Sequence, residues 1–268
     1  MAATQQKALI VGAGIVGAAS AYFLSRAGFE VTILDAVAPS AGATGSADGA
    51  VSVASKKPGP MMEAAIEGVA LYRQLRDDGL FAGLFKERST FMLAQDEAED
   101  AVLERHGSAL SESGVAIRHL DQTAVHQAIG NLSPRVRSAI EVRGEGHAIG
   151  FELVNRLLAA SGVTVRRGCK VDGLVVGHQS GSVKALTTSH GKIGLDLVVL
   201  AAGSGSAQLL GLDAVLRGRK GQLLVTERAP EINAGMPGSL MSCRYLISKD
   251  STDARMEETQ RRFGLVVD

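Results

Sequence analysis

The residues with the clearest chemical potential are three glycines near the amino end, Gly12, Gly14 and Gly17, in the stretch GAGIVG. This G-x-G-x-x-G spacing is typical of loops that bind a dinucleotide. The first glycine makes a tight turn, the second lets the backbone approach a pyrophosphate, and the third lets a helix pack close to a strand. The free N–H groups and partial positive charge at the start of that helix attract phosphate oxygens.

An acidic residue, Asp35, stands where a carboxylate can accept a hydrogen bond from a ribose hydroxyl. The carboxylate would repel a 2′-phosphate, and no arginine follows to receive one, so the pattern disfavours NADP. The motif and Asp35 together predict dinucleotide binding. The alternative is a coincidental glycine turn beside a surface aspartate. The motif alone does not separate NAD from FAD.

The elements that must position these residues can be predicted from the surrounding sequence. The apolar run KALIV, residues 7–11, is typical of a buried parallel strand. Residues 15–27 predict a helix, which Gly28 is placed to end because glycine enters the left-handed conformation freely. Residues 30–35 predict the second strand of a βαβ unit.

The stretch SAGATGSADG, residues 40–49, consists of small residues. It is either a flexible loop or a backbone that lies against a flat, extended ligand. The side chains and small residues that such a ligand could contact are Thr44, Gly45, Ser46, Asp48, Gly49 and Ala50.

These motifs give the sequence a resemblance to the FAD-dependent D-amino-acid oxidase-like family, which includes the glycine oxidase and sarcosine oxidase type. Its members combine the glycine motif, an acid ending the second strand, and a run similar to GATGSADGA that wraps the FAD near the flavin. The resemblance implies FAD as the cofactor. It extends to the helix expected at 151–161, the strands expected at 163–167 and 171–176, and LVVLAAG at 197–203. Gly150 stands where the family usually has proline, a departure expected to affect only the turn.

The resemblance also implies contacts to the adenine end of FAD at Val171, and a return of the chain to FAD at Ala202 and Gly203. For the last two residues a core strand followed by a turn is the alternative. The full set of residues assigned to the cofactor is Gly12, Gly14, Ile15, Val16, Gly17, Asp35, Thr44, Gly45, Ser46, Gly49, Ala50, Val171, Ala202 and Gly203.

The expected fold is α/β, a Rossmann-like FAD-binding domain with an inserted mixed-sheet substrate domain that is incomplete at the C-terminus. The FAD-binding domain is assigned to residues 1–85 and 144–215, and the partial substrate domain to 86–143 and 216–268. Helices are expected at 61–77 and 96–114, a helix capped by Asp121 follows, and strands are expected at 90–95, 115–120, 217–227, 239–250 and 263–267.

The activity implied by the resemblance is oxidation of the C–N bond of a small amino acid or secondary amine to an imine. The flavin performs this chemistry, so no catalytic acid or base is assigned. Tyr245 is the candidate substrate contact, with a half-buried strand tyrosine as the alternative. Neither Arg244 nor Arg255 is assigned to a substrate carboxylate, and both are expected to be surface charges. Related amine dehydrogenase subunits imply an electron-accepting partner chain.

Two other functions remain open from the sequence. One is a truncated, non-catalytic remnant that binds FAD or ADP, because the later sheet strands and final FAD-binding segment of the family have no counterpart. The other is an NAD-linked dehydrogenase, which would need a nicotinamide pocket and a catalytic acid or base.

Composition excludes several classes of protein. Lys+Arg and Asp+Glu number 28 each, so the zero net charge gives no sign of nucleic-acid or anionic-membrane binding. The two cysteines form no CxxC pair, and the six histidines show no metal-ligand spacing, so no metal is expected. No signal peptide and no run of about 18 apolar residues is visible, so we expect a cytoplasmic protein.

Overall fold

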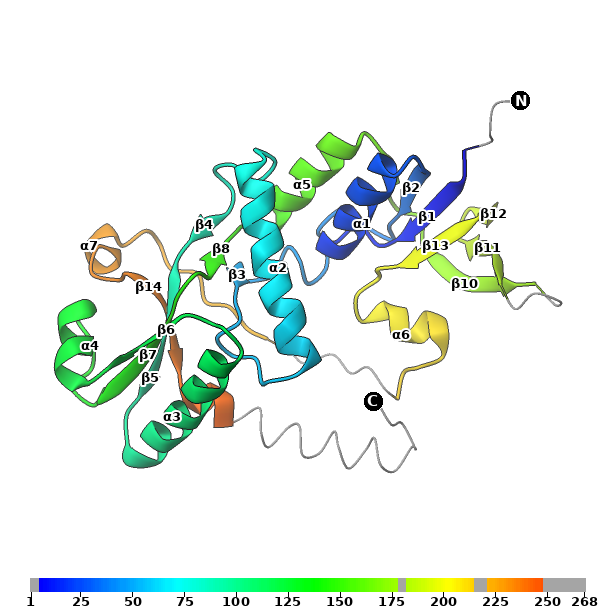
Figure 1. The fold of residues 1–268 in the computed structure, drawn as a ribbon. Coiled ribbons are helices and arrows are strands. Elements are labelled where there is room, and N and C mark those ends of the chain that lie inside the picture. The colour runs from blue at the N-terminus through cyan, green and yellow to red at the C-terminus, as the bar shows by residue number, and fades with distance from the viewer. Residues whose placement is uncertain (1–4, 178–181, 215–220, 248–268) are drawn as a thin grey trace. The chain divides into compact units, whose positions relative to one another are not determined.

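The computed structural model describes residues 5–177, 182–214 and 221–247 (Figure 1). The chain forms two compact units. The first unit comprises Met1–Ala50, Leu75–Phe85 and Ala148–Val225, and the second comprises Val51–Gln74, Lys86–His147 and Thr226–Asp268. Residues 51–74, which the sequence assigns to the FAD-binding domain, cluster with the second unit. The family resemblance alone does not show that residues 51–74 belong with the second unit.

The first unit is built on a parallel sheet of order β13-β1-β2-β9. Its strands are β1 (Lys7–Val11), β2 (Glu30–Leu34), β9 (Thr164–Arg166) and β13 (Leu197–Leu200). The four strands predicted from short apolar runs are therefore confirmed. Parallel strands need a covering layer on both faces, and the sequence supplies apolar residues for both.

Alternate residues of β1 face opposite layers of the first unit. Ala8 and Ile10 belong to the core formed with α1 (Ile15–Arg26) and α5 (Gly150–Ser161), which pack against each other (Figure 1). Leu9 and Val11 face the other layer. Burying each of these larger aliphatic side chains stabilises the fold by about 2 kcal/mol.

The other layer is a three-stranded antiparallel sheet, made by β10 (Val171–Val176), β11 (Val183–Thr188) and β12 (Gly191–Gly194). Its buried side chains, Val171 and Leu186, complete the core on that face. A short helix, α6 (Gly205–Leu210), follows β13. The first unit is thus a three-layer α/β arrangement. The α/β class agrees with the prediction, whereas the antiparallel third layer is not part of it.

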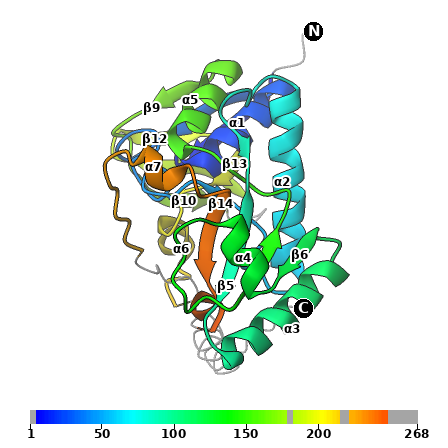
Figure 2. The ribbon, with the colours of Figure 1, turned by 90° about the vertical axis from the view of Figure 1, so that its left-hand side faces the viewer.

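The second unit contains a mixed sheet of order β14-β5-β7-β6. Its strands are β5 (Ser89–Ala94), β6 (Ile117–Leu120), β7 (Ser138–Val142) and β14 (Gly238–Ser242). Figure 2 shows β14, in orange, beside β5, to which it runs parallel. The remaining pairs are antiparallel.

Helices cover the two faces of this mixed sheet. Met62 of α2 (Pro60–Asp77) and Leu103 of α3 (Glu97–Glu112) share one core with Ile140. On the opposite face, Val125 of α4 (Gln122–Ala128) packs in a second core with Phe91. The N-terminus of α4 is capped by Asp121, as predicted, because its carboxylate accepts the Ala124 amide at 2.8 Å.

The remaining elements of the second unit are short. A small sheet of order β3-β8-β4 is formed where the chain enters and leaves the unit. Its strands are β3 (Ala50–Val51), β4 (Lys86–Glu87) and β8 (Gly146–His147), and one further short helix is α7 (Pro230–Asn233).

One predicted strand is wrong within the described residues, and another is confirmed only at its start. Residues 221–227 form no strand, and Leu224 is 97% exposed. The strand predicted at 239–250 ends at Ser242, after which a helical turn begins at Arg244 and buries Leu246 in the core. The alternating pattern continues past Ser242, but core burial favours the turn. Arg255 and residues 263–267 lie outside the described residues.

Candidate functional site

The candidate site lies at the carboxyl edge of the parallel sheet. The chain leaves β1 toward β2 on one side, while β13 pairs with β1 on the other side. Such a reversal of strand order opens a crevice beyond the strand ends, where open α/β sheets bind their ligands. The glycine loop follows β1 at this point.

Gly12 and Gly17 are required by close packing of the backbone. Gly12 has φ +103°, and a Cβ there would lie 2.4 Å from the carbonyl oxygen of Ala201. A Cβ on Gly17 would lie 1.9 Å from the carbonyl oxygen of Gly12. Both positions therefore exclude any side chain, which confirms the tight turn and the close helix contact expected from the motif.

Gly14 stands at the N-terminus of α1, where the helix presents free amides. Its φ of −78° is open to any residue, and an added Cβ would meet only Thr44 Oγ1, at 3.0 Å. The Ile15 amide donates to that hydroxyl at 3.0 Å. Val16 is 62% exposed, so the first turn of the helix is open to a ligand.

Asp35 lies directly after β2 and is half-buried. One carboxylate oxygen accepts the Ala13 amide at 2.8 Å, and the other accepts the Val37 amide at 2.8 Å. A carboxylate oxygen has two lone pairs, so each oxygen retains one acceptor site. Asp35 can therefore anchor the glycine loop and still accept a ribose hydroxyl.

The small-residue stretch 40–49 is a series of tight turns against the glycine loop. The Ser40 amide donates to the Ala13 carbonyl at 3.1 Å. A Cβ on Gly45 would lie 2.1 Å from the Ser40 carbonyl oxygen, and one on Gly150 would lie 2.5 Å from that of Thr44. The glycine at 150 therefore admits the close approach of Thr44, a consequence that reaches beyond the turn.

The structure brings some of the cofactor residues predicted later in the chain to the carboxyl edge of the parallel sheet. The Ala201 amide donates to the Val11 carbonyl at 2.8 Å, which places Ala202 and Gly203 beside the glycine loop. The Cys169 amide donates to the Asp35 carbonyl at 2.9 Å, while the Val171 side chain is buried in the core.

Other residues predicted for the site do not join the group around the glycine loop. Ser46 and Ala50 are exposed, and the Gly49 carbonyl accepts the Ala148 amide at 2.9 Å. Tyr245 belongs to the second unit and is 42% exposed.

Sequence reasoning missed one residue of the site, Ser40. It has φ +61°, and its Oγ is buried without a hydrogen-bond partner. Its residue type gives no signal of this conformation, because glycine or asparagine is usual there.

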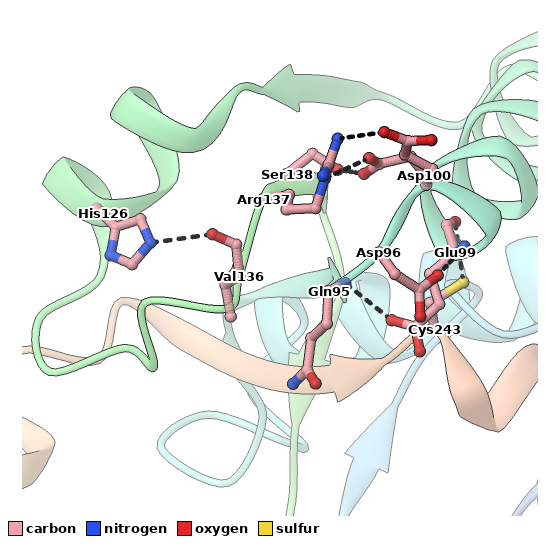
Figure 3. Close-up of polar contacts among 10 residues, drawn as sticks. Gln95, Asp96, Glu99, Asp100, His126, Val136, Arg137, Ser138 and Cys243 are labelled. Carbon is pink, nitrogen blue, oxygen red and sulfur yellow. Dashed lines mark hydrogen bonds and ion pairs between the residues drawn. The ribbon is translucent and has the colours of Figure 1, made fainter.

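The second unit holds buried carboxylates of its own. Glu99, 3% exposed, accepts the Gln95 amide and Arg244 Nε, both at 2.8 Å (Figure 3 shows the Gln95 contact). The hydrogen bond to Glu99 and its negative charge raise the pKa of Arg244. Arg244 is thus engaged in an ion pair.

Cys243 donates to the Glu99 carbonyl at 3.4 Å (Figure 3). Burial, together with the negative charge of Glu99, raises its pKa to about 11, so the thiol stays protonated at neutral pH. The described part of the chain contains no group of His, Cys, Asp or Glu arranged to hold a metal ion. None of its helices has the length and apolar character to span a bilayer.

Fold and site together define a dinucleotide-binding α/β protein with an attached mixed-sheet unit. Residues 7–256 match the family model described as FAD dependent oxidoreductase. The chain therefore belongs to this family. Membership confirms the prediction of FAD as the cofactor.

The sequence identity between this chain and individual relatives is low. The chain is 29% identical over 256 residues to one of the opine oxidase subunits of Rhizobium meliloti, covering 85% of this chain and 66% of that protein. It is 25% identical over 307 residues to the HcnC subunit of hydrogen cyanide synthase from Pseudomonas protegens, covering 97% and 73%. The structure of glycine oxidase from Bacillus cereus superposes with a TM-score of 0.69 at 25% identity, covering 78% and 59%. The chain thus spans about two thirds or less of the opine oxidase chain and the glycine oxidase.

Proposed function

We propose that this chain belongs to an FAD-dependent enzyme that oxidises the C–N bond of a small amino acid or secondary amine to an imine. The observation that carries the proposal is the glycine loop, locked between Thr44 and Asp35 at the carboxyl edge of the sheet. It occurs in a chain whose family uses FAD. In this proposal the first unit binds the cofactor and the second faces the substrate.

The residues of the first unit fit the parts of FAD. The amides of Gly14, Val16 and Gly17 at the start of α1 would bind the diphosphate. The Thr44 hydroxyl, which accepts the Ile15 amide, could donate its own proton to a phosphate oxygen. The remaining lone pairs of Asp35 would accept the ribose hydroxyls. Since Gly14 is the one motif glycine free of backbone contacts, its missing side chain leaves room for the ligand.

The other assigned residues remain predictions. From the resemblance, the backbone of Val171 would meet the adenine, and Ala202 and Gly203 would return to the FAD beside the first βαβ unit. Gly45, Ser46, Gly49 and Ala50 would line the cofactor along the small-residue loop. Tyr245 stays a predicted substrate contact.

Bound FAD would accept the hydride, and with it both electrons, from the carbon that bears the amine, and the proton lost from the nitrogen would pass to water. The chain's own task is to fix the cofactor by its diphosphate and ribose. No acid or base of the chain is assigned a proton transfer. The imine product hydrolyses in water.

The substrate class is supported by what the relatives are named for. One relative is named an opine oxidase subunit, and another is named a glycine oxidase. Two are also named as subunits, which supports an electron-accepting partner chain.

The proposal is tested with the purified chain and added FAD. Retention of the flavin bands after gel filtration tests cofactor binding. Anaerobic addition of glycine, N-methylglycine or an opine should then bleach the blue band, whereas lactate, which lacks the amine, should not. FAD retention with no bleaching by any amine would contradict the substrate class, and failure to retain FAD would contradict the cofactor site.

A further inference from the structure

Glu145 of the second unit is a carboxylate enclosed by hydrogen-bond donors. It is 2% exposed. Oε1 accepts the amides of Val53 and Ala54, each at 2.5 Å. Oε2 accepts the hydroxyls of Ser52, at 2.9 Å, and Thr90. Two donors on each oxygen fill the acceptor capacity of the carboxylate.

No arginine or lysine pairs with this carboxylate among the residues that the structure describes. The other buried glutamates of the unit do have a cation, Arg244 for Glu99 and Arg118 for Glu141. A buried charge held by neutral donors alone adds little net stability, because its loss of hydration offsets its hydrogen bonds. Its main physical effect is to hold its donors in one geometry.

The donors of Glu145 belong mainly to one stretch of chain, residues 52–54, and this stretch is held from the other side too. The Ala54 carbonyl contacts Nε2 of His106 at 2.6 Å, and the Val53 carbonyl accepts the Lys56 amide at 2.8 Å. Both Val53 and Ala54 are buried. The peptide groups of Val53 and Ala54 are thus held in one position.

This stretch directly follows the exit of the small-residue loop. β3 (Ala50–Val51) precedes it and pairs with β8, which begins one residue after Glu145. At the far end, the Ala148 amide donates to the Gly49 carbonyl at 2.9 Å. Residues 145–148 therefore hold residues 49–54 along their whole length, through strand pairing and the Glu145 side chain.

We propose that Glu145 is a positioning residue that fixes residues 49–54 and thereby sets the affinity for FAD. Gly49 and Ala50 contribute almost no side chain of their own, so the position of their backbone depends on what holds the flanking chain. The effect on FAD rests on the proposed function. The effect on the conformation of residues 49–54 does not.

The test compares three variants of the full chain, Glu145→Ala, Glu145→Gln and Glu99→Ala. The glutamine side chain in Glu145→Gln keeps the acceptor for the two amides, and its NH₂ group can donate to the two hydroxyls once they rotate. Glu99→Ala is the matched control, because Glu99 is also buried and also accepts a backbone amide, but does not contact residues 49–54. Hydrogen exchange of the chain without FAD and titration with FAD are measured for each.

In Glu145→Ala the amides of residues 50–54 should exchange at least about tenfold faster, and the FAD dissociation constant should rise about tenfold as the binding-competent conformation becomes a minor one. Glu145→Gln should restore both quantities to within about threefold. Glu99→Ala should lower stability with neither effect. Should Glu145→Ala fail to fold, Thr90→Val, which removes one donor at nearly constant volume, should still speed exchange at Val53 and Ala54.

Unchanged exchange at residues 50–54 in Glu145→Ala or in Thr90→Val would overturn the positioning role. Faster exchange with unchanged FAD affinity would overturn its link to the cofactor. A wild-type chain that binds no FAD would contradict the proposed function, and the exchange data would still decide whether Glu145 positions the loop.

Discussion

Two carboxylates of this molecule accept backbone amides in the same way but have different roles. Asp35 in the first unit and Glu145 in the second each accept a pair of backbone amides and so fix a neighbouring loop. Asp35 is half-buried and spreads the two amides over its two oxygens, which leaves each oxygen an acceptor site. Glu145 is buried, and its remaining sites are filled by hydroxyls.

The difference between Asp35 and Glu145 indicates how a carboxylate that binds a ligand can be distinguished from one that positions the chain. Both carboxylates accept backbone amides, so the presence of such bonds does not separate the two roles. The separating features are exposure and unused lone pairs, because a ligand hydroxyl needs both access and an acceptor. The following changes probe this contrast, from the largest expected effect to the smallest.

Gly17→Ala tests whether the loop beside Asp35 is set by packing. Its Cβ would lie 1.9 Å from the Gly12 carbonyl oxygen, so the helix must shift, and the free energy of unfolding should fall by about 3 kcal/mol. Urea unfolding measures the change. Gly173→Ala is the control, because a Cβ there meets no atom within 4 Å. Equal effects of both substitutions would show that the glycine loop is not tightly packed.

Asp35→Ala tests the open carboxylate directly. The loss of a charged acceptor for the ribose should weaken FAD binding by about 2 kcal/mol, or about 30-fold, in a fluorescence titration. Asp196 offers a matched control, since it also accepts a backbone amide in the first unit, that of Lys7 at 2.8 Å, but directly precedes β13, whereas Asp35 directly follows β2. If Asp196→Ala weakened FAD binding equally, acceptor sites at Asp35 would not explain the affinity.

Ser40→Gly should stabilise the small-residue stretch 40–49, which packs against the glycine loop. Glycine adopts the left-handed backbone without the strain of a Cβ and removes the unpaired buried hydroxyl, which should raise the free energy of unfolding by about 1 kcal/mol. Asn131, with φ +59°, is the control, because asparagine tolerates this conformation better than serine. Asn131→Gly should give a smaller gain in the free energy of unfolding, measured by urea unfolding.

Glu141 sharpens the contrast within the second unit, because arginines stabilise its charge. Burial alone would raise its pKa, but hydrogen bonds from Ser89 and Arg143 and the charges of Arg118 and Arg143 together hold the pKa below the ordinary value of 4.5. A lowered pKa stabilises the folded state above pH 4.5, and this contribution is lost as the pH falls through the folded pKa.

Glu141→Gln should therefore flatten the fall in stability below pH 4.5, by about 0.5 kcal/mol, as followed by urea unfolding at several pH values. Glu112, an exposed residue at the end of α3, serves as the control and should leave the profile unchanged when replaced by glutamine. An unaltered profile in Glu141→Gln would show that the arginines do not stabilise this charge.

Much of the first unit could be predicted from the sequence because its signals are local. Short apolar runs give the parallel strands, and the glycine spacing gives the turn and the close helix contact. The sequence does not predict the strands β11 and β12, because VKALTT and GKIG carry few apolar residues and depend on strand pairing, β11 with β10 and β12 with β11.

In the candidate site, residue types indicated Asp35 and Thr44, and the structure shows that both contact the glycine loop. The left-handed Ser40 and the buried Glu145 could not be found this way, because their roles depend on backbone groups distant in sequence. The turn after Ser242 was mispredicted for a similar reason, since the core that buries Leu246 comes from other elements.

The central claim, that the amides at the start of α1 bind the FAD diphosphate, is tested most directly by titrating FAD into the wild-type chain and Gly14→Val. The backbone of Gly14 admits any residue, so folding should change by no more than about 1 kcal/mol. The added side chain would displace Thr44 and cover the amides, so the dissociation constant of FAD should rise at least about 30-fold. A folded Gly14→Val chain that binds FAD as tightly as the wild type would contradict the account.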